Sequence, residues 1–123
     1  MTTRNTRIYE RGQIFSLWLR DHVAEHSDTV HREIERTLVL ESLELVGSLL
    51  MAAVFPADAK DHLAEGLRSL TRLRGQLGRA TRVGSIDAET ALRAYGEIAA
   101  LDRMLHGRRV TALDPTRRFA TNG

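Results

Sequence analysis

Helical periodicity, broken at only a few points, constrains the fold of this chain more than any other feature of its sequence. The two prolines, Pro56 and Pro115, lie outside the periodic segments, so nothing prevents long helices. No stretch alternates apolar and polar residues in the way that a half-buried strand requires. The sequence therefore predicts an all-α fold.

Two helices are expected in the first half of the chain. Apolar residues recur at helical spacing over residues 7–25 and again over residues 29–54. Ser27 or Asp28 can begin the second helix, because a short polar side chain before the first turn accepts a hydrogen bond from a free backbone N–H group.

The second half is punctuated in the same way. Pro56 suits the first turn of a third helix, where a backbone N–H group is not needed, and this helix should stop near Gly84. Ser85 or Asp87 can cap a fourth helix, and Gly107 is a typical stop residue.

Four helices with short connections predict an antiparallel up-and-down four-helix bundle. We place this bundle at residues 1–107 and expect residues 108–123 to form a basic, flexible C-terminal tail. A chain of 123 residues without cysteine fits one domain with neither disulfides nor thiolate metal sites. We see no leader or membrane anchor, since the longest apolar run, residues 45–55, is too short to span a bilayer, and we expect a cytoplasmic protein.

The second predicted helix is apolar around most of its circumference in its second half. Its first half has a single apolar stripe, whereas the stretch from Leu43 to Val54 has apolar residues on two sides. Such a helix needs two packing partners, so we expect self-association, most simply as a closed homo-oligomer. The alternative is that this helix is the most central one of a monomer.

Three charged residues lie on or beside predicted core stripes: Arg11, Glu41 and Asp102. A lone buried charge is too costly to leave without a partner. We therefore expect Arg11 to pair with Glu41 or Asp102, within one subunit or across an interface. The alternative is that the stripes are misplaced by one position and the charges are solvated.

Arginines gather on one side of the third predicted helix. Residues 66–85 contain five arginines and no acid. At about 100° per residue, four of them share an arc of roughly 80°, namely Arg68, Arg72, Arg79 and Arg82. Leucines cluster on the opposite side. Like charges so placed repel one another unless an anion faces them, which makes this side a candidate nucleic-acid interface.

Two plainer interpretations of this arginine side remain open. The side chains can simply be solvated, or they can pair with acidic residues of the second helix, Glu33 and Glu44, in a neighbouring subunit. Because exposed aromatic residues are scarce, a nucleic acid bound here would be recognised by its charge and shape more than by its sequence.

One pattern resembles a catalytic motif. His22, Glu25 and His26 follow the H-x-x-E-H order of some zinc proteases. A third metal ligand is missing nearby, and a domain of this size has no room for a protease cleft. We therefore expect no metal, no cofactor and no catalytic residues, and a protein that is not an enzyme.

Three blocks in order along the chain resemble one known family. They are the run FSLWLR at residues 15–20, the run LRGQLGRA at residues 73–80, and the segment from Glu97 to Gly107. Over residues 8–107 the chain is similar to the accessory variability determinant (Avd) proteins of diversity-generating retroelements and to the related bundles encoded in 23S ribosomal RNA intervening sequences.

The resemblance implies a fold and a function. Members of the family are four-helix bundles that form pentameric rings, bind RNA or DNA and a dedicated reverse transcriptase, and support mutagenic copying of a template RNA. Arg74 matches a family arginine, while the next family arginine falls at Gly78, with Arg79 beside it. We add Arg108 and Arg109, which stand where the family often has tryptophan, to the candidate nucleic-acid contacts.

Overall fold

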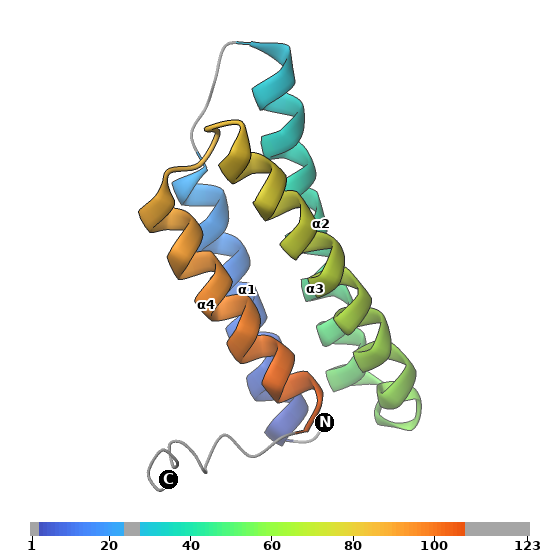
Figure 1. Ribbon diagram of the computed structural model, residues 1–123. Helices are drawn as coiled ribbons and strands as arrows, with labels where there is room; N and C mark the ends of the chain where they lie inside the picture. The colour runs from blue at the N-terminus through green and yellow to red at the C-terminus, as the bar shows by residue number, and fades with distance from the viewer. Residues whose placement is uncertain (1–2, 24–27, 108–123) are drawn as a thin grey trace, which may run out of the picture.

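Four antiparallel helices make up the computed structural model, which describes residues 3–23 and 28–107 (Figure 1). They are α1 (Thr3–His22), α2 (Thr29–Val54), α3 (Ala59–Arg82) and α4 (Ala88–Leu105). Around the bundle α1 packs against α2 and α4, and α3 packs against the same two helices. The predicted four-helix bundle is confirmed. The alternative cap Ser27 and the tail expected over 108–123 lie outside the described residues.

Aspartates cap the second and fourth helices, so in each predicted pair of candidate caps the aspartate is the residue used. The Asp28 carboxylate accepts a hydrogen bond from the backbone N–H of His31 at 2.9 Å, and Asp87 accepts one from Thr90 at 2.8 Å. The bond from Thr90 lowers the pKa of Asp87, because it stabilises the ionised carboxylate. Ser85, the other candidate for α4, is buried in the preceding turn.

The first helix begins four residues earlier than the periodicity predicts and ends at His22 instead of residue 25. Its start is fixed by neighbouring helices. The Arg4 guanidinium donates to the Met104 carbonyl oxygen of α4 at 2.6 Å, and the Asn5 amide donates to the Ala52 carbonyl oxygen of α2 at 3.4 Å. A signal of this kind is tertiary, so it is invisible in local sequence.

The third helix is bounded by proline and glycine. Pro56 does not start α3 itself; it opens a short 3-10 turn, Pro56–Asp58, that precedes the helix. At the other end Gly84 has a φ of 81°, a left-handed conformation that suits glycine. There the Ser85 N–H donates to the Ala80 carbonyl at 2.9 Å and the Gly84 N–H to that of Thr81 at 3.2 Å, which is the Schellman pattern.

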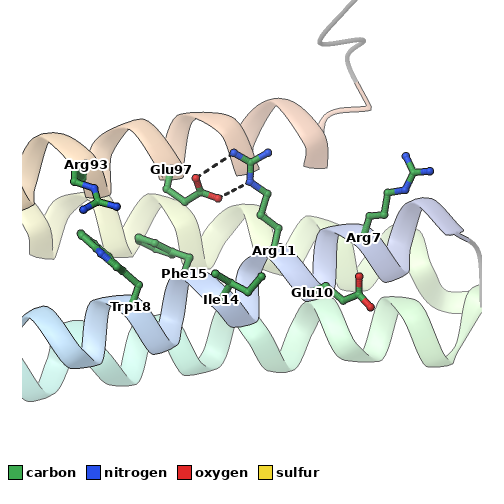
Figure 2. Close-up of a pocket in the computed structure, with 8 residues that line it drawn as sticks. All are labelled: Arg7, Glu10, Arg11, Ile14, Phe15, Trp18, Arg93 and Glu97. Atoms are coloured by element: carbon green, nitrogen blue, oxygen red, sulfur yellow. Dashed lines mark hydrogen bonds and ion pairs between the residues drawn. The ribbon is translucent and has the colours of Figure 1, made fainter.

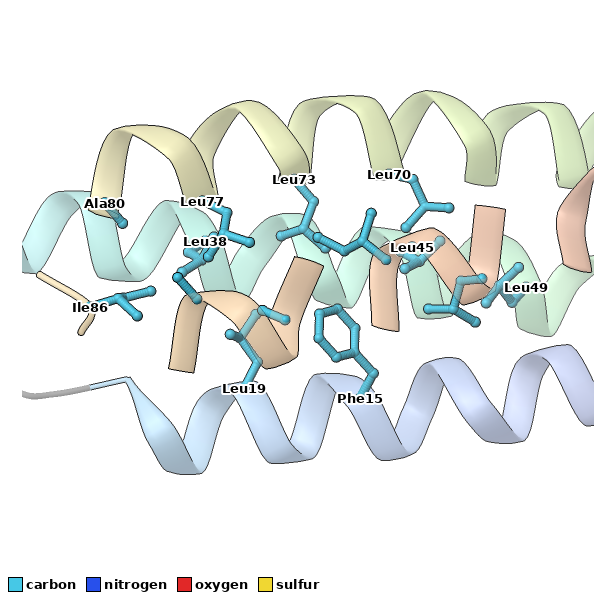
Figure 3. Packing of buried hydrophobic residues seen from close by; sticks show 14 of the residues in the cluster. Phe15, Leu19, Leu38, Leu45, Leu49, Leu70, Leu73, Leu77, Ala80 and Ile86 are labelled. Carbon is cyan, nitrogen blue, oxygen red and sulfur yellow. The ribbon is translucent and has the colours of Figure 1, made fainter. Parts of the chain in front are cut away.

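The core is aliphatic and runs the length of the bundle (Figure 3). Its largest fully buried side chains include leucines from all four helices, namely Leu19, Leu38, Leu45, Leu49, Leu70, Leu73, Leu77 and Leu101. Phe15 is the one aromatic residue among the buried hydrophobic side chains of the described chain. The packing of α1 on α2 is close, since a methyl group added to Gly12 would lie 2.6 Å from the Leu49 side chain.

The predicted pairing of Arg11 with Glu41 or Asp102 is wrong. Arg11 instead forms a two-bond ion pair with Glu97 of α4, at 2.6 and 3.1 Å. This bond raises the pKa of Arg11, because the guanidinium is stabilised by the facing carboxylate. Glu41 pairs with Arg72 at 3.1 Å. The three charges lie at the edge of the core, where each reaches a partner on the next helix or turn.

The second helix has two apolar sides, as its sequence predicts, but one of them faces outward. Its inner side packs in the core, and its outer side carries five exposed apolar residues, which we call the α2 stripe: Leu40, Leu43, Leu50, Met51 and Val54. Among the described residues α2 is also the one helix long and apolar enough to cross a membrane. Because its inner side packs against α1 and α3, we interpret α2 as a core helix of the bundle.

Candidate nucleic-acid interface

The two sides of α3 separate apolar from basic residues. Leu70, Leu73 and Leu77 are buried in the core, while Leu63 and Leu67 pack at its edge. All four arginines of the opposite side are exposed: Arg68, Arg72, Arg79 and Arg82. The predicted placement of the arginines opposite the packing side is therefore confirmed.

The first two of these arginines, the proximal pair Arg68 and Arg72, bind carboxylates of the same chain. Arg68 donates to Glu65 one turn earlier on α3, with its Nε atom 2.8 Å from the carboxylate oxygen. This contact lowers the pKa of Glu65, because the neighbouring guanidinium stabilises its ionised form.

Arg72 reaches from α3 to α2. Its Nε atom lies 3.1 Å from a Glu41 oxygen and its Nη2 atom 3.6 Å from a Glu44 oxygen, and it also donates to the Ser69 hydroxyl at 3.1 Å. The Glu41 bond raises the pKa of Arg72. The acidic partner expected from a neighbouring subunit, Glu44, thus contacts an arginine within this chain.

The last two arginines, the distal pair Arg79 and Arg82, have no such partners. Within residues 3–23 and 28–107 neither guanidinium makes an ion pair, and both side chains are exposed. Both lie in the last turn of α3, where cations interact favourably with the partial negative charge of a helix C-terminus. That interaction accounts for arginine at this end but leaves the guanidinium donors available to an external anion.

Arg74, the arginine that matches the family pattern, does not join this side. It lies two residues from Arg72, so the two side chains diverge by about 160° around α3. Arg74 is exposed, and no ion pair involves it in the described part of the chain. The structure thus separates Arg74 from the four clustered arginines. Arg108 and Arg109 lie outside the described residues.

The glycines inside α3 differ in their surroundings. A methyl group added to Gly78 would lie 3.3 Å from the Tyr95 hydroxyl of α4, so the absence of a side chain lets α4 approach here. Nothing lies within 4 Å of such a methyl group at Gly75. Gly78 therefore has a packing role, and Arg79 beside it is exposed.

The histidine motif does not gather metal ligands in the described residues. Glu25 and His26 lie outside them, and no group of three histidine, aspartate or glutamate side chains that could hold a metal ion occurs in residues 3–23 and 28–107. His22 stacks on Trp18 with ring centroids 4.6 Å apart, and its Nδ1 atom lies 2.9 Å from the Trp18 carbonyl oxygen.

Sequence reasoning missed a groove between α1 and α4. Its lining combines apolar residues of α1, of which Ile14 is exposed, Trp18 half-buried and Phe15 buried, with arginines of both helices (Figure 2). One clue is visible in the sequence: Ile14 is a large apolar residue that falls outside the core stripe of the first helix, and in the structure it is exposed. No protein-family model, curated protein or solved structure matches this chain, so its function has to be inferred from its own residues and the resemblance described above.

Proposed function

We propose that this protein is a non-enzymatic accessory factor that binds RNA or DNA through the arginine side of α3. The observation that carries the proposal is the distal pair, whose two exposed guanidiniums have no ion-pair partner in the described chain. Guanidinium groups on successive turns suit the phosphates of a nucleic-acid backbone, because each can donate two parallel bonds. We expect the proximal pair to contribute less to nucleic-acid binding, because Arg68 and Arg72 already bind Glu41, Glu44 and Glu65.

The resemblance supports a more specific role. By analogy with accessory variability determinant proteins, the chain would dock to a reverse transcriptase of a diversity-generating retroelement and support mutagenic reverse transcription. The related ribosomal intervening-sequence bundles offer a different setting for the same fold. The neighbouring genes distinguish the two: a reverse transcriptase gene would support the first, and flanking ribosomal RNA the second.

Self-association is part of the proposal. The α2 stripe is an exposed apolar surface on the most apolar helix, and burying it against another copy would remove it from water. A closed ring, a pentamer by resemblance, would repeat the arginine side in every subunit and strengthen its field beyond what a net charge of +2 implies.

A test of self-association uses the α2 stripe directly. Replacing Leu43 and Leu50 with glutamine should lower the mass measured by light scattering to that of a smaller assembly, while leaving the circular dichroism of the bundle intact. Leu92→Gln is a matched control, since Leu92 is 73% exposed on α4 and lies outside the stripe. An unchanged mass in the double variant would exclude the α2 stripe as the subunit interface.

Salt dependence tests nucleic-acid binding. Binding through several phosphates should lose orders of magnitude in affinity between about 50 and 200 mM salt, with little preference for sequence. Replacing Arg68, Arg72, Arg79 and Arg82 with glutamine should abolish binding and preserve helicity and mass. If the wild-type protein binds neither RNA nor DNA at low salt, the proposal fails. If the mass changes instead, these arginines form a subunit interface.

The second candidate function is a protein-interaction bundle whose arginines meet an acidic protein surface. The observation that favours it is Arg72, which binds two carboxylates, Glu41 and Glu44, on α2. The same guanidinium geometry accepts a carboxylate or a phosphate. A protein that ignores nucleic acid at low salt, yet binds an acidic protein surface through the same four arginines, would establish this alternative.

A further inference from the structure

A groove of about 510 Å³ lies between α1 and α4 (Figure 2). Its volume falls within the range of about 300 to 1,000 Å³ that is usual for ligand sites. We call it the α1–α4 groove and define it by six of its lining residues: Arg7, Ile14, Phe15, Trp18, Arg93 and Glu97. None of these residues belongs to the arginine side of α3 or to the α2 stripe.

The middle of the groove is apolar. Ile14 is 68% exposed although it is a large aliphatic residue, so it does not serve the core of this chain. The ring of Trp18 stacks with that of Phe15 at a centroid distance of 6.2 Å, and Ile14 lies on the other side of Phe15 along α1 (Figure 2). An exposed apolar surface beside two aromatic rings is typical of a place that receives an apolar side chain.

A guanidinium stands at each end of this apolar middle. Arg7 lies toward the start of α1, and Arg93 of α4 lies over the Trp18 ring, with its Cζ atom 5.0 Å from the ring centroid (Figure 2). Neither arginine makes an ion pair with any residue that the structure describes. The cation–π contact orients Arg93 but leaves its N–H donors free for a carboxylate.

The wall between the two ends is held in place. Arg11 of α1 and Glu97 of α4 are joined by two hydrogen bonds, at 2.6 and 3.1 Å, and so tie the two helices together between Arg7 and the apolar residues (Figure 2). Because these two charges satisfy each other, they contribute a neutral and preorganised wall. The charges left to meet a ligand are those of Arg7 and Arg93, with Glu10 at the rim.

We infer that the α1–α4 groove binds a short acidic peptide segment of a partner protein, with apolar side chains in its middle and carboxylates on both sides. Arg7 and Trp18 are eleven residues apart on α1, so the two ends of the groove are roughly 16 Å apart. About five residues of extended peptide cover that distance. Carboxylates at its ends would reach Arg7 and Arg93, while its apolar side chains contact Ile14 and the half-buried ring of Trp18.

A nucleic-acid strand fits this groove less well. Its phosphates are evenly spaced and would lie against the apolar middle, where they would lose hydration. The inference therefore stands apart from the proposed nucleic-acid function and does not depend on it.

The single tryptophan of the sequence makes the groove observable. Emission of Trp18 is followed while the acetylated peptide Glu-Glu-Leu-Phe-Glu-Glu is added to the full-length protein. We expect a saturable change. The peptide Gln-Gln-Leu-Phe-Gln-Gln, which lacks the charge, and the peptide Glu-Glu-Gly-Ser-Glu-Glu, which lacks the apolar middle, should each bind at least about tenfold more weakly.

Variants locate the binding site, with anisotropy of the fluorescein-labelled acidic peptide as the readout. The double variant R7Q/R93Q should lower the affinity for the acidic peptide by about tenfold and leave the affinity for the glutamine peptide unchanged. The variant I14S should lower the affinity for both peptides. The matched control R20Q/R103Q removes two exposed arginines outside the groove, on the same two helices, and should change neither.

Three outcomes would overturn the inference. Equal binding of the acidic peptide by R7Q/R93Q and by R20Q/R103Q would show that the groove arginines do not recognise it. A Trp18 response to single-stranded oligothymidylate, but not to the acidic peptide, would make the groove a base-stacking surface. A Trp18 response to protein concentration alone would make it a contact between copies of this chain.

Discussion

The proximal and distal pairs on α3 have the same residue type on the same side of one helix, but different surroundings. Arg68 and Arg72 bind carboxylates of α3 and α2, whereas Arg79 and Arg82 make no ion pair in the described chain. The difference comes from what each pair faces. Glu41 and Glu44 lie beside Arg72 on α2, whereas no ion pair joins Arg79 or Arg82 to α2 within the described residues.

This comparison teaches that clustering of like charges and availability to a ligand are separate properties. Four arginines within a narrow arc look equivalent in the sequence. In the structure half of them are already engaged, Arg68 by Glu65 of α3 itself and Arg72 by carboxylates of α2, whereas the distal pair keeps its guanidinium donors available. The predictions below test whether the two pairs really differ in function.

The largest expected effect is on nucleic-acid affinity. R79Q/R82Q should weaken binding to a short RNA by at least about tenfold at low salt and reduce the salt slope by about two, because two phosphate contacts are lost. R68Q/R72Q should weaken it much less. Fluorescence anisotropy over a salt series measures both, with R20Q/R103Q as the control for net charge. Equal losses in the two α3 variants would contradict the distinction between the pairs.

A second effect, of a few fold, is expected when the engaged arginine is released. E41Q/E44Q removes both carboxylates that bind Arg72 and should strengthen RNA binding by about threefold, since the guanidinium becomes available and two repelling charges disappear. E33Q, which removes an exposed glutamate without an ion pair to the distal arginines, is the control. The triple variant E41Q/E44Q/R72Q should lose part of the gain.

The arginine that matters least for RNA binding should matter most for thermal stability. R72Q removes the ion pairs of Arg72 with Glu41 and Glu44 of α2. It should lower the melting temperature by about 2 °C, the scale of an exposed ion pair in a small domain. R82Q breaks no ion pair and should lower it by less, through the helix terminus alone. Circular dichroism melts distinguish these cases. A larger loss in R82Q would mean that the distal pair has a structural partner.

The smallest effect concerns pH. The folded pKa of Glu65 is lowered by Arg68, so this pair stabilises the fold above the unfolded pKa of glutamate and ceases to do so as pH falls through the lowered value. The difference in melting temperature between wild type and R68Q should therefore be present at neutral pH and vanish between about pH 5 and pH 3. A difference that persists below this range would have to arise from packing of the arginine stem.

Much of the fold follows from local sequence. The Asp28 and Asp87 caps, the glycine that ends α3 and the leucine stripe of α3 each depend on contacts within a few residues, and each was predictable. Positions of the clustered arginines follow from the same periodicity. These features need no knowledge of how the helices pack.

Partners between helices could not be predicted in this way. Arg11 pairs with Glu97, 86 residues away, because of the level and rotation at which α1 meets α4. The same two variables decide that Arg72 meets Glu41 and Glu44, and that Ile14 stays exposed in the α1–α4 groove. Periodicity fixes the side of one helix on which a residue lies, but the facing residue depends on the register between two helices.

The hydrogen bond from Arg4 to the Met104 carbonyl has a practical consequence for handling this molecule. It brings the start of α1 and the end of α4 to the same end of the bundle (Figure 1). Helix α3 has 24 residues and so extends for roughly 36 Å, which carries Arg82 to the opposite end. The distal arginines therefore lie at the opposite end of the bundle from Arg4 and Met104, so a surface that holds that end leaves them facing open solution.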